Sequence, residues 1–333
     1  MNRRDASFVL LALGSATAPW RSFGQQPPKV WQIGSISLAA PGPNEISAAF
    51  VQRLRELGYV EGRNLVVDRR YAAGDVTQLP QMASDLVQRK VDVILAQTNY
   101  IAEVAKRTTR TIPIVIPLAA DPVGAGLAES LARPGGNVTG LSMMTVELAG
   151  KKLQLLRELV PGLRRVAVLA LAHATEPGFA TGSRLLLDQL QQAAQQLGIT
   201  LLPQAAGVEA DIPKAFAAMR RDGAKALVVQ ASALSVTHRK LIADLAAQQH
   251  LPAIYDSKLA AEEGGLISYG PDYLEMYRRS AELVDKIFKG ASPGEIPFEQ
   301  PSKYEMVVNL KTARALGIRI PQSILLRADQ VTE

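Results

Sequence analysis

The sequence contains no cysteine in its 333 residues. Without thiols, the chain forms no disulfide, no thiolate metal site and no lipidated N-terminal cysteine. Its three histidines, His173, His238 and His250, lie far apart and match no spacing that zinc ligands use. The sequence therefore predicts no metal site.

Aromatic residues are also scarce, at 5% of the chain, and basic residues are scattered along it. The formal net charge is +6, from 37 Lys and Arg residues against 31 Asp and Glu residues. A nucleic-acid-binding surface combines a basic stripe with aromatic side chains that stack on bases. We therefore expect no nucleic-acid partner.

Long apolar runs are missing, and the N-terminal run is short. A basic start, Met1–Arg4, precedes the apolar stretch Phe8–Ala18, and Ser22-Phe-Gly24 then offers small residues before a cleavage point. This pattern is typical of a secretory signal peptide and is too short to span a bilayer stably. We predict a signal peptide over residues 1–24 and a periplasmic mature protein. The Arg3-Arg4 pair leaves both the Sec route and the twin-arginine route open.

Short apolar runs alternate with amphipathic segments in the rest of the chain. The expected strands are Val30–Ser37, Leu65–Tyr71, Val91–Gln97, Ile112–Ala120, Val138–Met144, Arg165–Ala172, Ile199–Gln204, Ala226–Ser232 and Pro252–Asp256. Helices are expected between most of them, including one that starts near Gly124 and Gly126. Such alternation builds parallel sheets. The predicted fold class is α/β, with two doubly wound parallel-sheet lobes and a ligand cleft and hinge between them.

The two halves of the chain match each other at a constant offset of 133 residues. The matching pairs are Ala72-Ala-Gly74 with Ala205-Ala-Gly207, Pro80 with Pro213, and Val91–Gln97 with Ala224–Gln230. Several matches at one offset, with no gap between them, indicate that one supersecondary unit is used twice.

The last sixty-odd residues are too few to bury a core of their own. They contain one expected helix, Tyr273–Lys289, two expected strands, Leu266–Gly270 and Tyr304–Leu310, and a proline-rich segment between them. We expect them to dock on both lobes, so that the chain crosses between the lobes more than once. The predicted N-terminal lobe comprises residues 30–145 and 271–290, and the predicted C-terminal lobe comprises residues 147–269 and 300–333.

Gly124-Ala-Gly126 is the only short motif that suggests a cofactor. A dinucleotide-binding turn needs Gly or Ala at the sixth position of the motif, in the first strand–helix turn, with an acidic residue about 20 positions later. Here the sixth position is Glu129, and the motif follows the fourth expected strand. No Walker loop and no GxSxG motif occurs. We predict no cofactor and no catalytic residues.

Polar side chains gather where the expected strands end. In open α/β sheets, ligands bind at the carboxyl ends of the strands, against helix N-termini. The candidate ligand-binding residues are Ser37, Gln97, Thr98, Asn99, Asp121, Met144, His173, Gln230, Ser232, Tyr255, Asp256 and Tyr269. Ser37, Thr98 and Asp121 have an alternative role as helix caps, and His173 has one as a surface loop residue.

Several segments resemble a known family. They are Leu54-Arg-Glu-Leu-Gly-Tyr-Val-Glu-Gly-Arg-Asn64, Asp121-Pro-Val-Gly-Ala-Gly-Leu127, Ser130-Leu-Ala-Arg-Pro-Gly-Gly-Asn-Val-Thr-Gly140, Leu251-Pro-Ala-Ile-Tyr255, Gly264-Gly-Leu-Ile-Ser-Tyr-Gly270 and Asn309-Leu-Lys-Thr-Ala313. They resemble the ABC transporter substrate-binding proteins that include tryptophan and tyrosine receptors. The resemblance implies a type I periplasmic-binding-protein fold, an inner-membrane permease and its ATPase. At His173–Pro177 and Asp256–Lys258 the chain departs from the family's usual Asn-Pro and Gly-Phe-Arg.

These observations predict an extracytoplasmic receptor, monomeric and not an enzyme, that delivers a small solute to an ABC importer. The expected solute is amino-acid-like or another small carboxylate. Its carboxylate would meet helix starts near Ser37, Thr98 and Ser232, and Asp121 or Asp256 would face an ammonium group. A sensor module for signalling is an alternative that uses the same cleft, and a doubly wound α/β enzyme is a second one.

Overall fold

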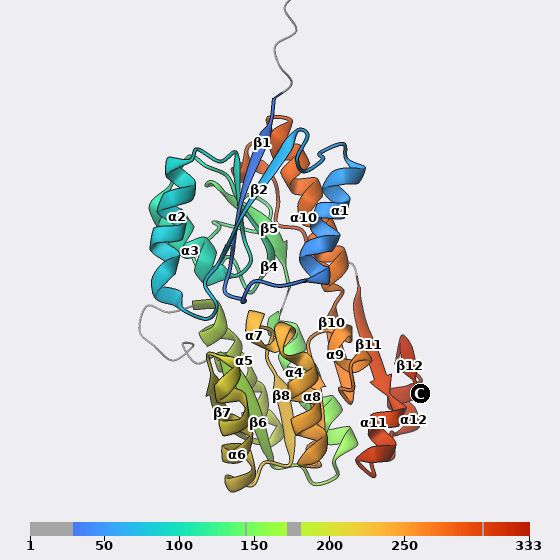
Figure 1. The fold of residues 1–333 in the computed structure, drawn as a ribbon. Coiled ribbons are helices and arrows are strands. Elements are labelled where there is room, and N and C mark those ends of the chain that lie inside the picture. The colour runs from blue at the N-terminus through green and yellow to red at the C-terminus, as the bar shows by residue number, and fades with distance from the viewer. Residues whose placement is uncertain (1–28, 144, 172–180, 302) are drawn as a thin grey trace, which may run out of the picture.

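The computed structural model describes residues 29–143, 145–171, 181–301 and 303–333. Two sheets lie one above the other, each with helices on both faces (Figure 1). We call the two halves the N-terminal and C-terminal lobes. The expected signal peptide lies outside the described residues. No helix in the described part of the chain is long and apolar enough to cross a membrane.

The N-terminal sheet has five parallel strands in the order β2-β1-β3-β4-β5. The strands are β1 (Trp31–Ser37), β2 (Leu65–Tyr71), β3 (Val93–Ala96), β4 (Ile114–Ala119) and β5 (Val138–Ser142). Helices α1 (Glu45–Glu56) and α10 (Tyr273–Phe288) cover one face, and α2 (Leu79–Gln88) and α3 (Asn99–Thr108) cover the other (Figure 1).

Strand β3 shows why the expected strands are apolar at successive positions. Val93 and Leu95 pack in the core under α1 and α10, whereas Ile94 and Ala96 pack in the core under α2 and α3. Successive side chains of a strand point to opposite faces, so a strand with helices on both sides needs apolar residues at every position.

The C-terminal sheet has seven strands in the order β12-β11-β10-β9-β8-β6-β7. They are β6 (Arg165–Leu171), β7 (Thr200–Ala206), β8 (Ala226–Val229), β9 (Ala253–Tyr255), β10 (Ile267–Pro271), β11 (Tyr304–Asn309) and β12 (Gln330–Thr332). One face carries α4 (Thr145–Leu159), α5 (Thr181–Leu197), α11 (Leu310–Ala315) and α12 (Gln322–Leu325). The other carries α6 (Ile212–Arg221), α7 (Ala233–Thr237), α8 (Arg239–Gln248) and α9 (Lys258–Glu262).

The 133-residue offset extends to whole elements. Adding 133 to both bounds of the 3₁₀ helix Val76–Gln78, of α2 and of β3 gives the bounds of the 3₁₀ helix Glu209–Asp211, of α6 and of β8. The strand orders of the two sheets also correspond, because β2-β1-β3-β4-β5 maps onto β7-β6-β8-β9-β10. The predicted use of one supersecondary unit in both lobes is therefore confirmed.

The chain passes between the lobes three times within the described residues. It leaves β5 for α4, leaves β10 for α10, and returns to β11 after the 3₁₀ helix Pro293–Glu295. On the last passage Glu299 forms a β-bridge with Leu141 next to the N-terminal sheet. The predicted repeated crossing is confirmed.

One expectation is wrong. Residues 121–133 contain no helix, because Asp121 and Gly126 adopt left-handed backbone angles (φ 43° and 68°) and the segment turns there. The C-terminal sheet is parallel, as predicted, except that β11 pairs with β10 in the antiparallel sense. The connection from β10 to β11 passes through α10 in the other lobe, so the right-handed crossover of a parallel β-α-β unit does not apply to it.

Candidate ligand-binding site

A cleft lies between the lobes, where the carboxyl ends of both sheets face each other. Its volume is about 560 Å³, counting the space at its mouth. The residues that line it are Ala39, Asn44, Ile46, Gln97, Thr98, Leu118 and Met143 of the N-terminal lobe, Ala231, Ser232, Ala233, Val236 and Thr237 of the C-terminal lobe, and Tyr273 and Tyr277 of α10.

Two helix starts supply polar groups to the cleft. Thr98 is the N-cap of α3 and its hydroxyl accepts a hydrogen bond from the Ile101 amide at 3.4 Å. Ser232 is the N-cap of α7 and its hydroxyl accepts from the Ser235 amide at 3.0 Å. Both hydroxyls cap a helix and also line the cleft, so the two roles that the sequence left open for Thr98 are compatible. Helix starts attract carboxylate groups.

The rest of the cleft wall is largely apolar. Leu118 and Met143 come from the end of the N-terminal sheet, and Tyr273 and Tyr277 come from successive turns of α10. Burial raises the pKa of both tyrosine hydroxyls, so they stay uncharged at neutral pH. The cleft can therefore hold a flat or bulky apolar group beside the polar helix starts.

A smaller cavity of about 300 Å³, counting the open space at its mouth, shares Ala231, Val236 and Tyr273 with the cleft, and we call it the inner cavity. Its other lining residues are Val229, Gln230, Ser235, Arg239, Tyr255, Asp256, Ser257, Leu259 and Ala260. It therefore lies on the C-terminal-lobe side of the cleft, around the ends of β8 and β9.

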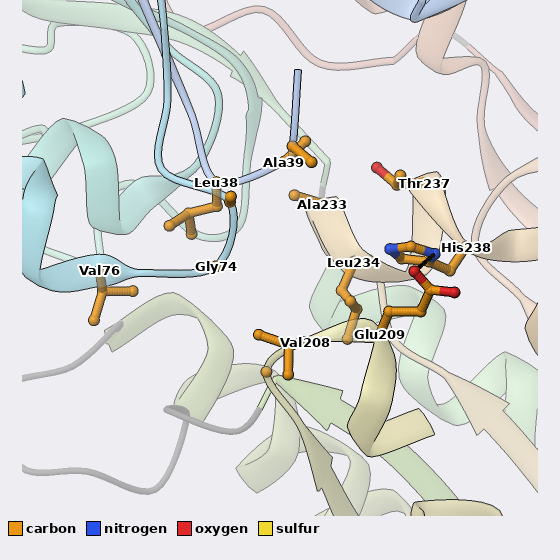
Figure 2. A pocket seen from close by; sticks show the side chains of 13 residues that line it. Leu38, Ala39, Gly74, Val76, Val208, Glu209, Ala233, Leu234, Thr237 and His238 are labelled. Atoms are coloured by element: carbon orange, nitrogen blue, oxygen red, sulfur yellow. Dashed lines mark ion pairs between the residues drawn. The ribbon is translucent and has the colours of Figure 1, made fainter. Parts of the chain in front are cut away.

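The lobes touch beside the cleft. In Figure 2, the side chains of Leu38 and Val76 face those of Val208 and Leu234 across a pocket of about 800 Å³. At Gly74, a Cβ atom would lie 3.1 Å from the Gly207 carbonyl oxygen. These are the loops related by the 133-residue offset. A cross-lobe ion pair, Arg239–Glu45 at 2.7 Å, adds a second contact.

Half of the predicted site residues line either the cleft or the inner cavity. Gln97, Thr98 and Ser232 line the cleft, and Gln230, Tyr255 and Asp256 line the inner cavity. Ser37 is buried beside them, and its hydroxyl accepts from the Ala39 amide at 3.0 Å. Met144 and His173 lie outside the described residues.

The other three predicted residues make contacts away from these spaces. Asn99 donates to the Ala120 carbonyl and accepts from its amide, which fixes the end of β4. Asp121 accepts from the Gly124 amide at 2.9 Å, the capping contact that the sequence left open. Tyr269 packs on Tyr304 with 6.2 Å between ring centroids.

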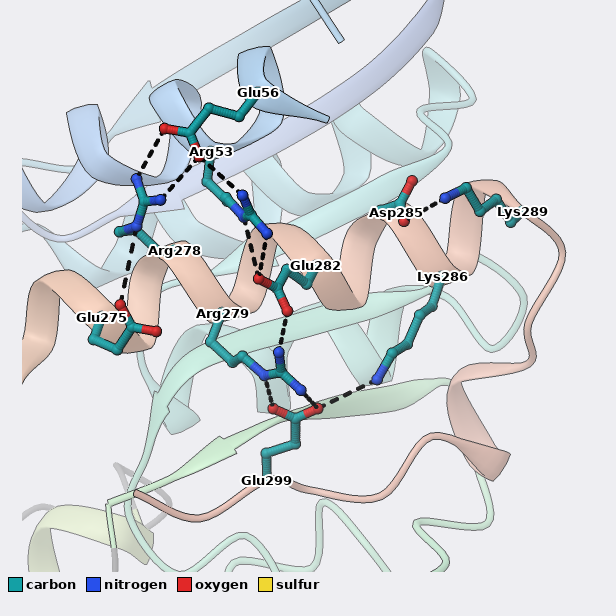
Figure 3. Close-up of polar contacts among 10 residues, drawn as sticks. All are labelled: Arg53, Glu56, Glu275, Arg278, Arg279, Glu282, Asp285, Lys286, Lys289 and Glu299. Carbon is teal, nitrogen blue, oxygen red and sulfur yellow. Dashed lines mark hydrogen bonds and ion pairs between the residues drawn. The ribbon is translucent and has the colours of Figure 1, made fainter. Parts of the chain in front are cut away.

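Helix α10, which carries both cleft tyrosines, is tied to the N-terminal lobe by ion pairs (Figure 3). Arg53 of α1 pairs with Glu282 at 2.8 Å, and Glu56 pairs with Arg278 at 2.9 Å. Arg279 pairs with Glu299, on the returning segment, at 2.5 Å. The two neighbouring guanidinium groups lower the pKa of Glu56 to about 2.

We expect part of the stability that this network supplies to be lost in acid. Since the folded-state pKa of Glu56 is depressed, its contribution is present above its ordinary pKa of 4.5 and is lost as pH falls toward about 2. The melting temperature of the parent protein should therefore decline more between pH 4.5 and pH 2 than that of Glu56→Gln. Glu275→Gln is the matched control, because Glu275 lies 3.9 Å from Arg278 at the exposed edge of the network. Parallel curves for parent and Glu56→Gln would contradict the expectation.

Comparisons with known proteins identify the family. A family model described as "ABC transporter substrate binding protein" matches residues 35–332. The chain belongs to this family. A tyrosine-binding protein of Clostridioides difficile (strain R20291) is 26% identical over 280 residues, which cover 84% of this chain and 78% of that protein.

Solved structures extend the comparison. A conserved domain protein from Vibrio cholerae is 27% identical, with a TM-score of 0.81 over 91% of this chain and all of that one. An ABC domain from Streptococcus pneumonia in complex with L-Trp is 24% identical, with a TM-score of 0.78 over 90% of this chain and 99% of that one. The predicted type I periplasmic-binding-protein fold and the predicted role as a substrate-binding protein of an ABC transporter are confirmed.

Proposed function

We propose that this substrate-binding protein captures an α-amino acid with a ring-bearing side chain and delivers it to an inner-membrane permease and its ATPase. The observation that carries the proposal is the composition of the cleft. Two helix starts with capping hydroxyls, Thr98 and Ser232, stand beside an apolar wall that includes Met143 and Tyr273. The relative from Clostridioides difficile, named a tyrosine-binding protein, supports the same solute class.

The carboxylate and the side chain of such a solute each have a counterpart in the cleft. The start of α3, with the Thr98 hydroxyl at its N-cap, suits a carboxylate, an interaction of about 0.3–1 kcal/mol at a helix start. Apolar walls suit the side chain, at about 25 cal/mol for each Å² of apolar surface removed from water. A sugar needs polar partners on most of its faces, which Leu118, Met143 and Val236 do not offer.

The proposal also covers the export, the oligomeric state and the lobe movement of the protein. We propose export through the signal peptide, action as a monomer, and no catalysis. Residues 30–145 with 271–290, and 147–269 with 300–333, would move as two rigid lobes about the crossing segments. A sensor role would use the same cleft. Loss of solute uptake in cells that lack the protein would favour transport over sensing.

A thermal-shift screen of the mature protein tests the solute class. L-tyrosine, L-tryptophan and L-phenylalanine should each raise the melting temperature, and at a hundredfold excess over Kd the gain in stability is about 2.7 kcal/mol. The corresponding D-amino acids and glucose are the controls and should have little effect. Mass spectrometry should recover the bound amino acid unchanged. Stabilisation by glucose without stabilisation by any amino acid would reject the proposal.

A further inference from the structure

A buried ion pair lies behind the inner cavity. The Lys152 ammonium group of α4 contacts Oδ1 of Asp256, which follows β9. Lys152 is 5% exposed and Asp256 is 7% exposed, so both charges are removed from water. Burial lowers the pKa of Lys152 to about 7, so its carboxylate partner is needed to favour the charged ammonium form.

The position of the pair follows from the strand pattern. Val228 and Ile254 face α4 in the core of the C-terminal lobe. Gln230 and Asp256 come two residues further along β8 and β9, so they emerge on the same face at the carboxyl end of the sheet. Both line the inner cavity, next to Lys152.

The inner cavity is rich in hydrogen-bond donors that lack acceptors. Four residues that line it carry a buried polar atom with no hydrogen-bond partner among the described residues: Nε2 of Gln230, Nε of Arg239, and the hydroxyls of Tyr255 and Tyr273. Gln230 is 4% exposed and Tyr273 is 2% exposed. Buried donors are normally paired, so several unpaired donors around one space indicate that an acceptor enters it.

We propose that the inner cavity binds a second carboxylate, carried at the far end of the solute's side chain, and that Lys152 positions and neutralises Asp256 for this purpose. A carboxylate offers about four acceptor sites, which suits several donors better than a hydroxyl does. An unpaired Asp256 would repel this group, and its ion pair with Lys152 removes that repulsion. The inference rests on the proposed function, because the amino-acid head would occupy the cleft.

Calorimetric titration of the mature protein with L-phenylalanine and 4-carboxy-L-phenylalanine tests the inference. The two probes differ only at the far end of the ring. The parent protein should bind the carboxylated probe at least tenfold more tightly. Lys152→Met should abolish this preference, because Asp256 then keeps an uncompensated negative charge beside the cavity.

The double variant Lys152→Met/Asp256→Asn removes both charges and should regain a preference for the carboxylated probe. If Lys152→Met fails to fold, the double variant can still be titrated, since it leaves no buried charge unpaired. Equal binding of both probes by the parent protein would overturn the inference and leave the proposed function intact. A preference that survives Lys152→Met unchanged would overturn the role of Lys152. Binding of neither probe would overturn the proposed function and the inference together.

Discussion

Replacement of Ala233 by tryptophan should abolish solute binding and leave the unliganded protein folded. Ala233 is the first residue of α7, and it lines both the cleft and the neighbouring pocket in Figure 2. An indole ring at this position would project into the space of about 560 Å³ where the solute is expected to bind. Ala233 is partly exposed and lines both spaces, so the larger side chain does not have to enter the core of the C-terminal lobe. We expect a loss of affinity of at least about 100-fold, or about 2.7 kcal/mol.

Isothermal titration with an amino acid that stabilises the parent protein measures this effect. Ala217→Trp is the matched control, because Ala217 is an exposed residue of α6 in the same lobe, away from the cleft. The control should bind like the parent. The melting temperature of unliganded Ala233→Trp should stay within about 3 °C of the parent value, as for a surface change of at most about 0.5 kcal/mol. Full affinity in Ala233→Trp would show that the solute binds elsewhere.

The sequence was sufficient to predict the two-lobed fold, for a physical reason. Strands with helices on both faces are apolar at every position, so β3 and β8 stand out from the amphipathic helices around them. The match between the two halves at an offset of 133 residues independently supported two similar lobes, because corresponding helices and strands bury the same faces. Residues 121–133 misled the prediction, since a turn and a helix start use the same residues, Asp, Pro and Gly.

Part of the candidate site could be predicted, because the carboxyl ends of the strands face the cleft in this architecture. Gln97, Thr98 and Ser232 were predicted on that ground, and they line the cleft. Tyr273 and Tyr277 were missed, because aromatic residues four positions apart on a helix look the same whether they pack in a core or line a cleft. Lys152 was missed because its partner Asp256 is 104 positions away, and nothing near it in the sequence marks it as buried.

Replacement of Gly270 by alanine should have the largest effect on stability among single methyl additions in the C-terminal sheet. Gly270 lies in β10, where the chain is about to cross to α10. A Cβ atom here would lie 1.8 Å from the carbonyl oxygen of Asp256, far inside van der Waals contact. The obstacle is backbone and cannot rotate away, so β9 and β10 would have to separate. We expect a loss of about 3 kcal/mol in the free energy of unfolding.

Chemical denaturation and thermal melting measure this loss, which corresponds to a fall in melting temperature of about 6 °C or more. Gly150→Ala is the control. Gly150 lies inside α4, and a Cβ atom there would meet only the Ala193 methyl at 3.8 Å, an ordinary contact. Because alanine favours the helix over glycine, the control should gain about 0.5–1 kcal/mol. Equal stability of Gly270→Ala and the parent would contradict the close approach of the two strands.

The same substitution also tests whether the crossing segment positions the site. Asp256 carries the buried pair with Lys152, and Tyr273, three residues after Gly270, lines both the cleft and the inner cavity. A separation of β9 from β10 must move at least one of them, so the surviving folded Gly270→Ala protein should bind the solute at least about tenfold more weakly, or by about 1.4 kcal/mol. Gly150→Ala should bind like the parent. Reduced stability with full affinity would mean that the strands shift as a unit with the site, and that the crossing near Gly270 supports the fold alone.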